Sequence, residues 1–147
     1  MTHWLYPVNP TNRDSWGYTD SPTSVMARKG IQIWHVPRRL SITTGDLIWV
    51  RESIHQDNPV AKVVGVGVVR SEEPWAEDDA YRFKVLFGTG LCQHLAASPL
   101  TLIVDSIPMS ARKLKEREQA QLAPVLFEFT VAETRAQALG KRSASVL

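Results

Sequence analysis

The alternation of apolar and polar residues predicts a protein built mainly from short strands. Residues 81–87 alternate between a row of Tyr, Phe, Val and Phe and a row of Arg, Lys and Leu, which is the period of a half-buried strand. Residues 31–36 alternate weakly and fit either a strand or a short turn before Pro37. Other apolar runs bounded by turn-forming residues predict strands at 4–8, 47–52, 60–69 and 100–104.

Polar segments predict loops, and two of them carry tryptophans. Residues 9–24 are rich in Pro, Asn, Asp, Ser and Thr, and they predict a long loop that holds Trp16 and Tyr18. Loops of this length in a compact domain are often functional. An acidic loop is predicted at residues 71–79 around Trp75, and a polar loop at residues 54–59.

The C-terminal third of the chain predicts helices. Residues 111–122 are rich in Ala, Lys, Glu and Gln, and residues 130–139 begin with a Thr-x-x-Glu capping box and end before a glycine. The tail at 141–147 is expected to fray. Together the elements predict one α+β domain over residues 1–147, in which five or six strands curl into a barrel with peripheral helices.

Composition and charge narrow the classes of protein. The 147 residues are 44% hydrophobic and 22% charged, which predicts a folded protein, and the net charge of +2 neither requires nor excludes a nucleic-acid partner. The single Cys92 permits no internal disulfide, and no apolar run is long enough to span a membrane. Residues 1–10 lack the pattern of a signal peptide, so a cytoplasmic location is expected.

The first candidate site lies on the predicted strand at 47–52. Leu47, Trp49, Arg51 and Ser53 fall on one face, because side chains alternate along a strand. A flat aromatic ring beside a hydrogen-bond donor suits a planar heteroaromatic ligand. The structural alternative is that Trp49 fills the interior of the barrel and Arg51 forms a salt bridge at its mouth.

A second candidate site combines an aromatic residue with cations. Trp34 is followed by Arg38 and Arg39 and preceded by Arg28 and Lys29, an arrangement that can hold a phosphate backbone beside a stacking platform. The alternative is a solvated basic turn with Trp34 in the core.

Two glycines share one face of the predicted strand at 60–69. Gly65 and Gly67 leave a strip without side chains, which fits a ligand groove or, more commonly, the close packing of a helix or a bend of the barrel. Their spacing does not match a phosphate-binding loop.

Catalytic and metal-binding patterns are weak. The four histidines lie in separate segments, and Cys92 with His94 has no second pair to complete a zinc site. No orienting environment for a cysteine nucleophile is visible, so neither an enzyme nor a metal or other cofactor is expected. The basic positions of residues 112–117 alternate with glutamates, as on a solvated helix.

Three short motifs resemble the EVE domains of the PUA-like superfamily. They are an aromatic opening strand, a Gly-Asp-Leu turn before a strand ending in serine, and a Val-Gly strand, found here as His3-Trp4-Leu5, Gly45-Asp46-Leu47 to Ser53, and Val63-Val64-Gly65-Val66 with Val69. The likeness covers about residues 3–87. It implies a β-barrel-like domain and a pocket for a flipped or modified base in DNA or RNA. The chain departs from the family at 34–38, and at Arg51 and Glu52, where an aromatic residue and a histidine are usual.

Two hypotheses follow. The first is a non-catalytic nucleic-acid reader, with Trp34 and Trp49 as pocket walls and Arg51 and Ser53 as hydrogen-bonding groups. The long loop would close this pocket and the basic residues would bind phosphates, through Trp16, Tyr18, Lys29, Arg38 and Arg39. The second, motivated by the departures at Arg51 and Glu52, is a protein-interaction or accessory module that keeps the fold and has no functional base pocket.

Overall fold

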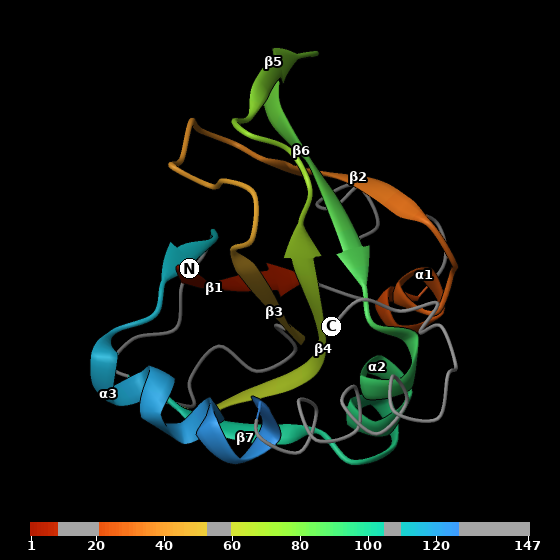
Figure 1. Cartoon of the computed structure of the whole chain (residues 1–147), viewed down its shortest axis with the longest axis vertical. Helices are drawn as coiled ribbons and strands as arrows, with labels where there is room; N and C mark the ends of the chain where they lie inside the picture. Colours follow the sequence, from red (N-terminus) through yellow and green to blue (C-terminus); the bar gives the residue numbers. More distant parts are fainter. Residues whose placement is uncertain (9–20, 53–59, 105–109, 127–147) are drawn as a thin grey trace, which may run out of the picture.

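A mixed eight-stranded sheet is the framework of the computed structural model, which describes residues 1–8, 21–52, 60–104 and 110–126 (Figure 1). Six strands lie in the order β2-β6-β4-β3-β1-β8, while β5 pairs with β6 and β7 pairs with β4. β1 and β3 run parallel, and the other described pairs are antiparallel. The bounds are β1 His3–Val8, β2 Ile31–Val36, β3 Leu47–Glu52, β4 Val60–Val69, β5 Trp75–Glu77, β6 Ala80–Phe87, β7 Leu100–Ile103 and β8 Arg112–Lys113. The sheet curls into a half-barrel, which confirms the expected curled α+β architecture.

Short helices lie beside the sheet. Helix α1 (Pro22–Met26) packs against α2 (Thr89–Ala97), and both contact β4. Helix α3 (Glu116–Gln119) and the 3₁₀-helix η2 (Ala120–Leu122) follow β8 on the other side of the molecule (Figure 1). No helix among the described residues is long and apolar enough to span a bilayer.

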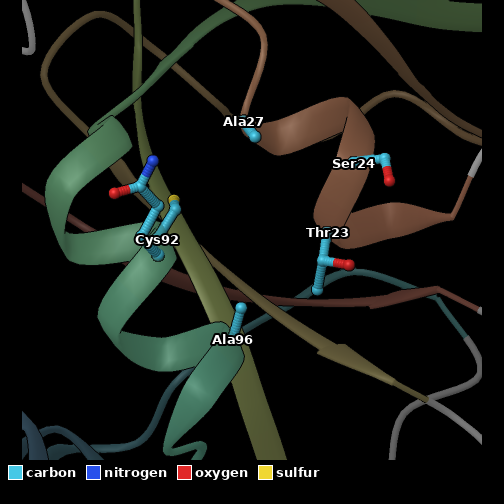
Figure 2. Close-up of a pocket in the computed structure, with 6 residues that line it drawn as sticks. Thr23, Ser24, Ala27, Cys92 and Ala96 are labelled. Atoms are coloured by element: carbon cyan, nitrogen blue, oxygen red, sulfur yellow. The ribbon is translucent and has the colours of Figure 1, made fainter.

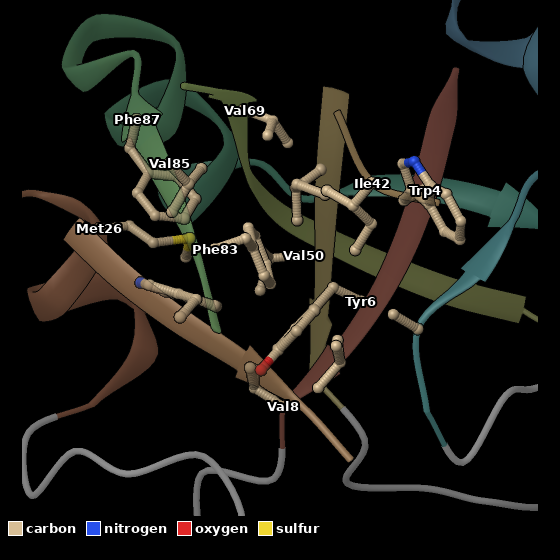
Figure 3. Close-up of a cluster of buried hydrophobic side chains, with 14 of the residues drawn as sticks. Trp4, Tyr6, Val8, Met26, Ile42, Val50, Val69, Phe83, Val85 and Phe87 are labelled. Atoms are coloured by element: carbon tan, nitrogen blue, oxygen red, sulfur yellow. The ribbon is translucent and has the colours of Figure 1, made fainter. Parts of the chain in front are cut away.

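Side chains from the two faces of the sheet form two hydrophobic clusters. Along β3, Ile48 and Val50 point into one cluster, while Leu47 and Trp49 point into the other. We call the first the Trp34 cluster, which also contains Tyr6, Met26, Phe83, Val85 and Phe87 (Figure 3). We call the second the Trp49 cluster, which also contains Leu5, Val63, Val66, Leu95, Leu102, Leu114 and Leu122.

The two glycines of β4 are explained by close packing. A Cβ atom added at Gly65 would overlap the Sδ atom of Met26 from α1. A Cβ at Gly67 would lie 2.6 Å from Val85 Cγ2 and 2.9 Å from Phe87 Cδ1. The strip without side chains is therefore filled by protein atoms, and helix packing accounts for Gly65.

The strands predicted at 4–8, 47–52, 60–69, 81–87 and 100–104 are all present to within one residue at each end, and residues 31–36 form a strand, not the alternative short turn. Strand β6 places Phe83, Val85 and Phe87 in the Trp34 cluster with Tyr81 packed against it, as the alternation predicts. This agreement follows from the period-two burial of strands that pack on one face.

Three local predictions were wrong, and one helix was missed. Helix α1 at 22–26 overlaps the end of the loop predicted at 9–24, residues 75–77 form β5 within the predicted acidic loop, and α2 had not been predicted. The predicted helix at 111–122 begins only at Glu116, because residues 112–113 pair with Trp4 and Leu5 of β1 as β8. The hydrogen bonds that residues 112–113 gain by pairing with the edge of β1 outweigh the helix propensity of these two residues. The predicted helix at 130–139 and loop at 54–59 lie outside the described residues.

The carboxylate of Asp46 joins the start of β1 to the turn before β3. Its Oδ1 accepts a hydrogen bond from Thr2 N–H at 3.0 Å, and its Oδ2 accepts from Trp4 Nε1 and Thr43 N–H, each at 3.0 Å. Asp46 is 2% exposed. The preceding Gly45 has a φ of 90°, which a side chain would disfavour. The Gly-Asp pair is therefore a structural anchor.

We expect Asp46→Asn to lower the free energy of unfolding by about 3 kcal/mol, because an amide NH₂ group would face donors left without an acceptor in the interior. Urea denaturation measures this change. Asp79→Asn is the matched control, since Asp79 is exposed and has a φ of 62°, a conformation that Asn tolerates. Equal stabilities of the two variants would contradict the anchoring role.

Candidate functional site

Trp49 is part of the protein interior. It is fully buried, and its Nε1 donates a hydrogen bond to His3 Nδ1 at 3.0 Å. The two rings are stacked, with centroids 6.2 Å apart and an interplanar angle of 22°. Burial and the nearby N-terminal amino group lower the pKa of His3, while Asp46 opposes this shift. The neutral imidazole accepts from the indole, so the structural alternative is confirmed for Trp49.

Arg51 belongs to a buried charged cluster with Arg112 and Glu118. Arg51 is 3% exposed, and burial followed by the charge of Arg112 lowers the pKa of its guanidinium. Arg112 donates two hydrogen bonds to Glu118, at 2.7 and 2.8 Å, and Lys115 N–H donates a third at 2.8 Å. The Arg112 hydrogen bonds are the largest cause of the lowered pKa of Glu118. These contacts fix α3 against β8, and they indicate a structural role for Arg112 and Glu118.

Trp34 is equally enclosed on the other face of the sheet. It is 1% exposed, and its Nε1 donates to Gln32 Oε1 at 2.9 Å. Its ring lies 4.9 Å from that of Phe87 and 5.2 Å from that of Tyr6, between centroids. Gln32 Nε2 in turn donates to the carbonyl of Val25 in α1 at 2.7 Å. Gln32 therefore connects β2 to α1 and holds the indole of Trp34.

The expected pocket between Trp34 and Trp49 is not formed. The two side chains pack in different clusters on opposite faces of the sheet, and neither is open to a ligand. The sequence could not show this, because alternation orders side chains within one strand and does not relate the faces of β2 and β3. Ser53, Trp16 and Tyr18 lie outside the described residues.

The expected phosphate-binding residues are exposed but do not lie together. Lys29 precedes β2, whereas Arg38 and Arg39 follow it. Six residues of extended strand separate the two groups by about 20 Å. Arg39 also lies 3.4 Å from Glu73, an ion pair between two exposed side chains. The structure therefore does not combine these cations into one phosphate site.

A pocket of about 280 Å³ lies between α1 and α2 (Figure 2). Its lining is small and partly polar: Thr23, Ser24, Ala27, Cys92, Gln93 and Ala96. Sequence reasoning missed it because neither helix had been predicted. Ser21 followed by Pro22 was the available signal for α1, since Ser21 is its N-cap and proline is favoured in the first turn.

Cys92 contributes no nucleophile to this pocket. Burial raises the pKa of its thiol to about 11, and the thiol donates to the Val66 carbonyl at 3.3 Å. A thiol with this pKa is protonated at neutral pH, and the thiolate is the reactive form. Within the described ranges, no three His, Cys, Asp or Glu side chains come together as a metal site would require.

Exposed aliphatic side chains mark a different surface, which we call the β2–β6 face. Ile31 and Ile33 are 55% and 46% exposed, and they point to the same side of β2 because they are two residues apart. Across the sheet, Ile31 pairs with Leu86, which pairs with Val68, both half-buried. Ile33 pairs with Lys84. The face thus combines an apolar row with a cation, and sequence alternation alone did not identify it as open.

No family model, curated protein or solved structure matches this chain in the three comparisons.

The lowered pKa of His3 predicts a pH-dependent stability. The unfolded chain, with an ordinary histidine pKa of about 6.5, binds a proton more readily than the folded chain. The free energy of unfolding should therefore be constant above about pH 7 and fall as the pH drops below 6.5. Denaturation at several pH values between about 5.5 and 7.5 measures this slope.

Two variants isolate the contribution of His3. His3→Asn keeps an acceptor for the Trp49 indole and cannot titrate, so its slope should be smaller than that of the wild type. His94→Asn makes the same substitution at an exposed histidine of α2 and is the matched control. An unchanged slope in His3→Asn would exclude His3 as the titrating group.

Proposed function

We propose that the protein is a non-catalytic interaction module that binds a partner protein through the β2–β6 face. The observation that carries this proposal is the contrast between the buried Trp34 and Trp49 and the exposed Ile31 and Ile33. A base reader needs an accessible aromatic surface, whereas an exposed aliphatic patch is suited to the side chains of another protein.

The shape of the β2–β6 face supports a docking role. Ile31 and Ile33 stand about 7 Å apart on one strand, and Leu86 lies about 5 Å from Ile31 across the pair. Single apolar residues scattered over a protein surface are normal, whereas neighbouring exposed apolar residues form a patch of the kind that binds another protein. A partner would continue the packing of the Trp49 cluster outwards through Val68 and Leu86, which are half-buried.

The absence of catalysis is part of this proposal. Three buried groups of types that can act as an acid, a base or a nucleophile form structural contacts instead. His3 contacts Trp49, Glu118 contacts Arg112, and the Cys92 thiol contacts the Val66 carbonyl. Such contacts stabilise the fold and leave these groups without a substrate-facing role.

We also propose that the chain has the PUA-like fold of the EVE domains that it resembles. The curled half-barrel is compatible with a PUA-like domain, and Asp46 gives the Gly-Asp-Leu element a structural purpose. In this proposal the chain keeps such a fold in the cytoplasm while the interior positions that would open into a pocket are filled by Trp49 and Arg51.

Substitution of the two isoleucines tests the interaction surface. We expect Ile31→Ser/Ile33→Ser to lose a protein partner that the wild type retains in affinity capture with quantitative mass spectrometry, because serine removes the apolar contact area. Ile103→Ser is the matched control, since Ile103 is 65% exposed on β7 and should leave capture unchanged. Equal loss from both variants, or from neither, would refute the assignment.

A second candidate function is recognition of a nucleic-acid base in the pocket between α1 and α2. The observation that favours it is the polar rim of Thr23, Ser24 and Gln93 around about 280 Å³, close to the lower end of small-ligand pockets. Lys29 follows α1 by three residues and is exposed, so it supplies a cation near the C-terminal end of this helix.

The base-binding candidate is tested by filling the pocket. Ala96→Leu should reduce the affinity for single-stranded DNA or RNA oligonucleotides, methylated or unmethylated, by about tenfold or more, measured by fluorescence anisotropy at two salt concentrations. Ala97→Leu, an exposed neighbour outside the pocket lining, should have no effect. Failure of the wild type to bind any oligonucleotide would exclude this candidate.

A further inference from the structure

The β2–β6 face carries cations beside its apolar row. Lys84 lies between Ile33 on β2 and Arg70 at the end of β4, where Arg70 N–H donates to the Lys84 carbonyl at 2.8 Å. Val68 and Leu86 point to this face. Arg70 follows Val68 by two residues and Lys84 precedes Leu86 by two, so both cations point to the same face. Both cations are exposed.

The charge of these two residues is not balanced within the described part of the chain. Neither Arg70 nor Lys84 forms an ion pair there. Arg82, the next cation on this face of β6, lies 3.5 Å from Glu77 and 3.9 Å from Asp78, so its charge is already offset. The positive charge is thus concentrated beside Ile33.

We propose that the partner presents an acidic amphipathic segment to the β2–β6 face. Its apolar side chains would cover Ile31, Ile33 and Leu86, and its carboxylates would approach Lys84 and Arg70. This inference rests on the proposed interaction function and adds the chemistry of the partner. Complementary charge at the rim of an apolar patch accelerates association and selects among partners with similar apolar surfaces.

Two other occupants fit the face less well. A second copy docked face to face would bring a second set of the cations Lys84 and Arg70 into the same interface, which adds like charges to one contact. A nucleic acid fits the aliphatic row of Ile31, Ile33 and Leu86 poorly, because this row offers no aromatic ring on which a base could stack. The acidic protein segment satisfies both the apolar row and the charge.

Designed peptides supply a direct test on the full chain. Three labelled peptides share the same leucines at helical spacing and carry Glu, Gln or Lys at the remaining positions. We expect the Glu peptide to bind about tenfold more tightly than the Gln peptide in fluorescence anisotropy at about 0.05 M salt, and the Lys peptide to bind most weakly. The preference should shrink at about 0.3 M salt, where charges are screened over a shorter distance.

Charge reversal assigns this preference to the β2–β6 face. Lys84→Glu should remove or invert the preference for the Glu peptide, and Lys84→Gln should reduce it. The control Lys62→Glu makes the same charge change at an exposed position near the other end of β4, and it should preserve the order of affinities. Thermal unfolding of each variant verifies that it is folded.

The outcomes separate the chemistry of the partner from the proposed function. Equal binding of the Glu and Gln peptides, with both lost in Ile31→Ser/Ile33→Ser, would overturn the acidic partner and leave the interaction function standing. Binding of no peptide, or binding that the isoleucine substitutions do not change, would overturn both. Self-association in sedimentation that is lost in Ile31→Ser/Ile33→Ser, or oligonucleotide binding lost in Lys84→Glu, would replace the acidic segment with a second copy or a nucleic acid.

Discussion

The organisation of the sheet depends on the buried carboxylate of Asp46. β1 and β3 are parallel neighbours, so the chain must return from the end of one to the start of the other through a distant connection. Asp46 holds the two starting points together by accepting from Thr2, Trp4 and Thr43, while Leu47 N–H donates to the Thr2 carbonyl at 2.9 Å. Because Asp46 is only 2% exposed, water cannot easily replace these charge-assisted bonds. Once this junction is set, β3 can carry Trp49 to one face and Val50 to the other.

Polar contacts inside the protein complete the packing of its largest side chains. Each of three buried indoles donates to a nearby acceptor: Trp4 to Asp46, Trp34 to Gln32, and Trp49 to His3. A buried indole without an acceptor would be unfavourable, so these pairs explain how a half-barrel can enclose three tryptophans. The same pairs leave the indoles unavailable to an outside ligand. Trp34 and Trp49, which the sequence predicts as the walls of a base pocket, belong to the core.

The surface chemistry of the described residues is concentrated elsewhere. The β2–β6 face joins an apolar row to two cations that lack a described ion-pair partner, whereas the groove between α1 and α2 offers small polar groups. These two sites differ in the size and nature of what they would bind, an extended protein segment or a single planar group. They share the property that neither depends on Trp34 or Trp49.

Local sequence determined the strands, the separation of side chains along them, and the turn at Gly45. These features depend on neighbouring residues, since alternation and turn conformations are fixed within a few positions. The tertiary structure alone decided that Trp49 is enclosed, because its neighbours in the interior, His3, Leu114 and Leu122, come from distant parts of the chain. It also decided that residues 112–113 form a strand and that the side chains of Ile31 and Ile33 are exposed. The alternation of residues along a strand predicts which side chains share a face, but only long-range packing determines what covers that face.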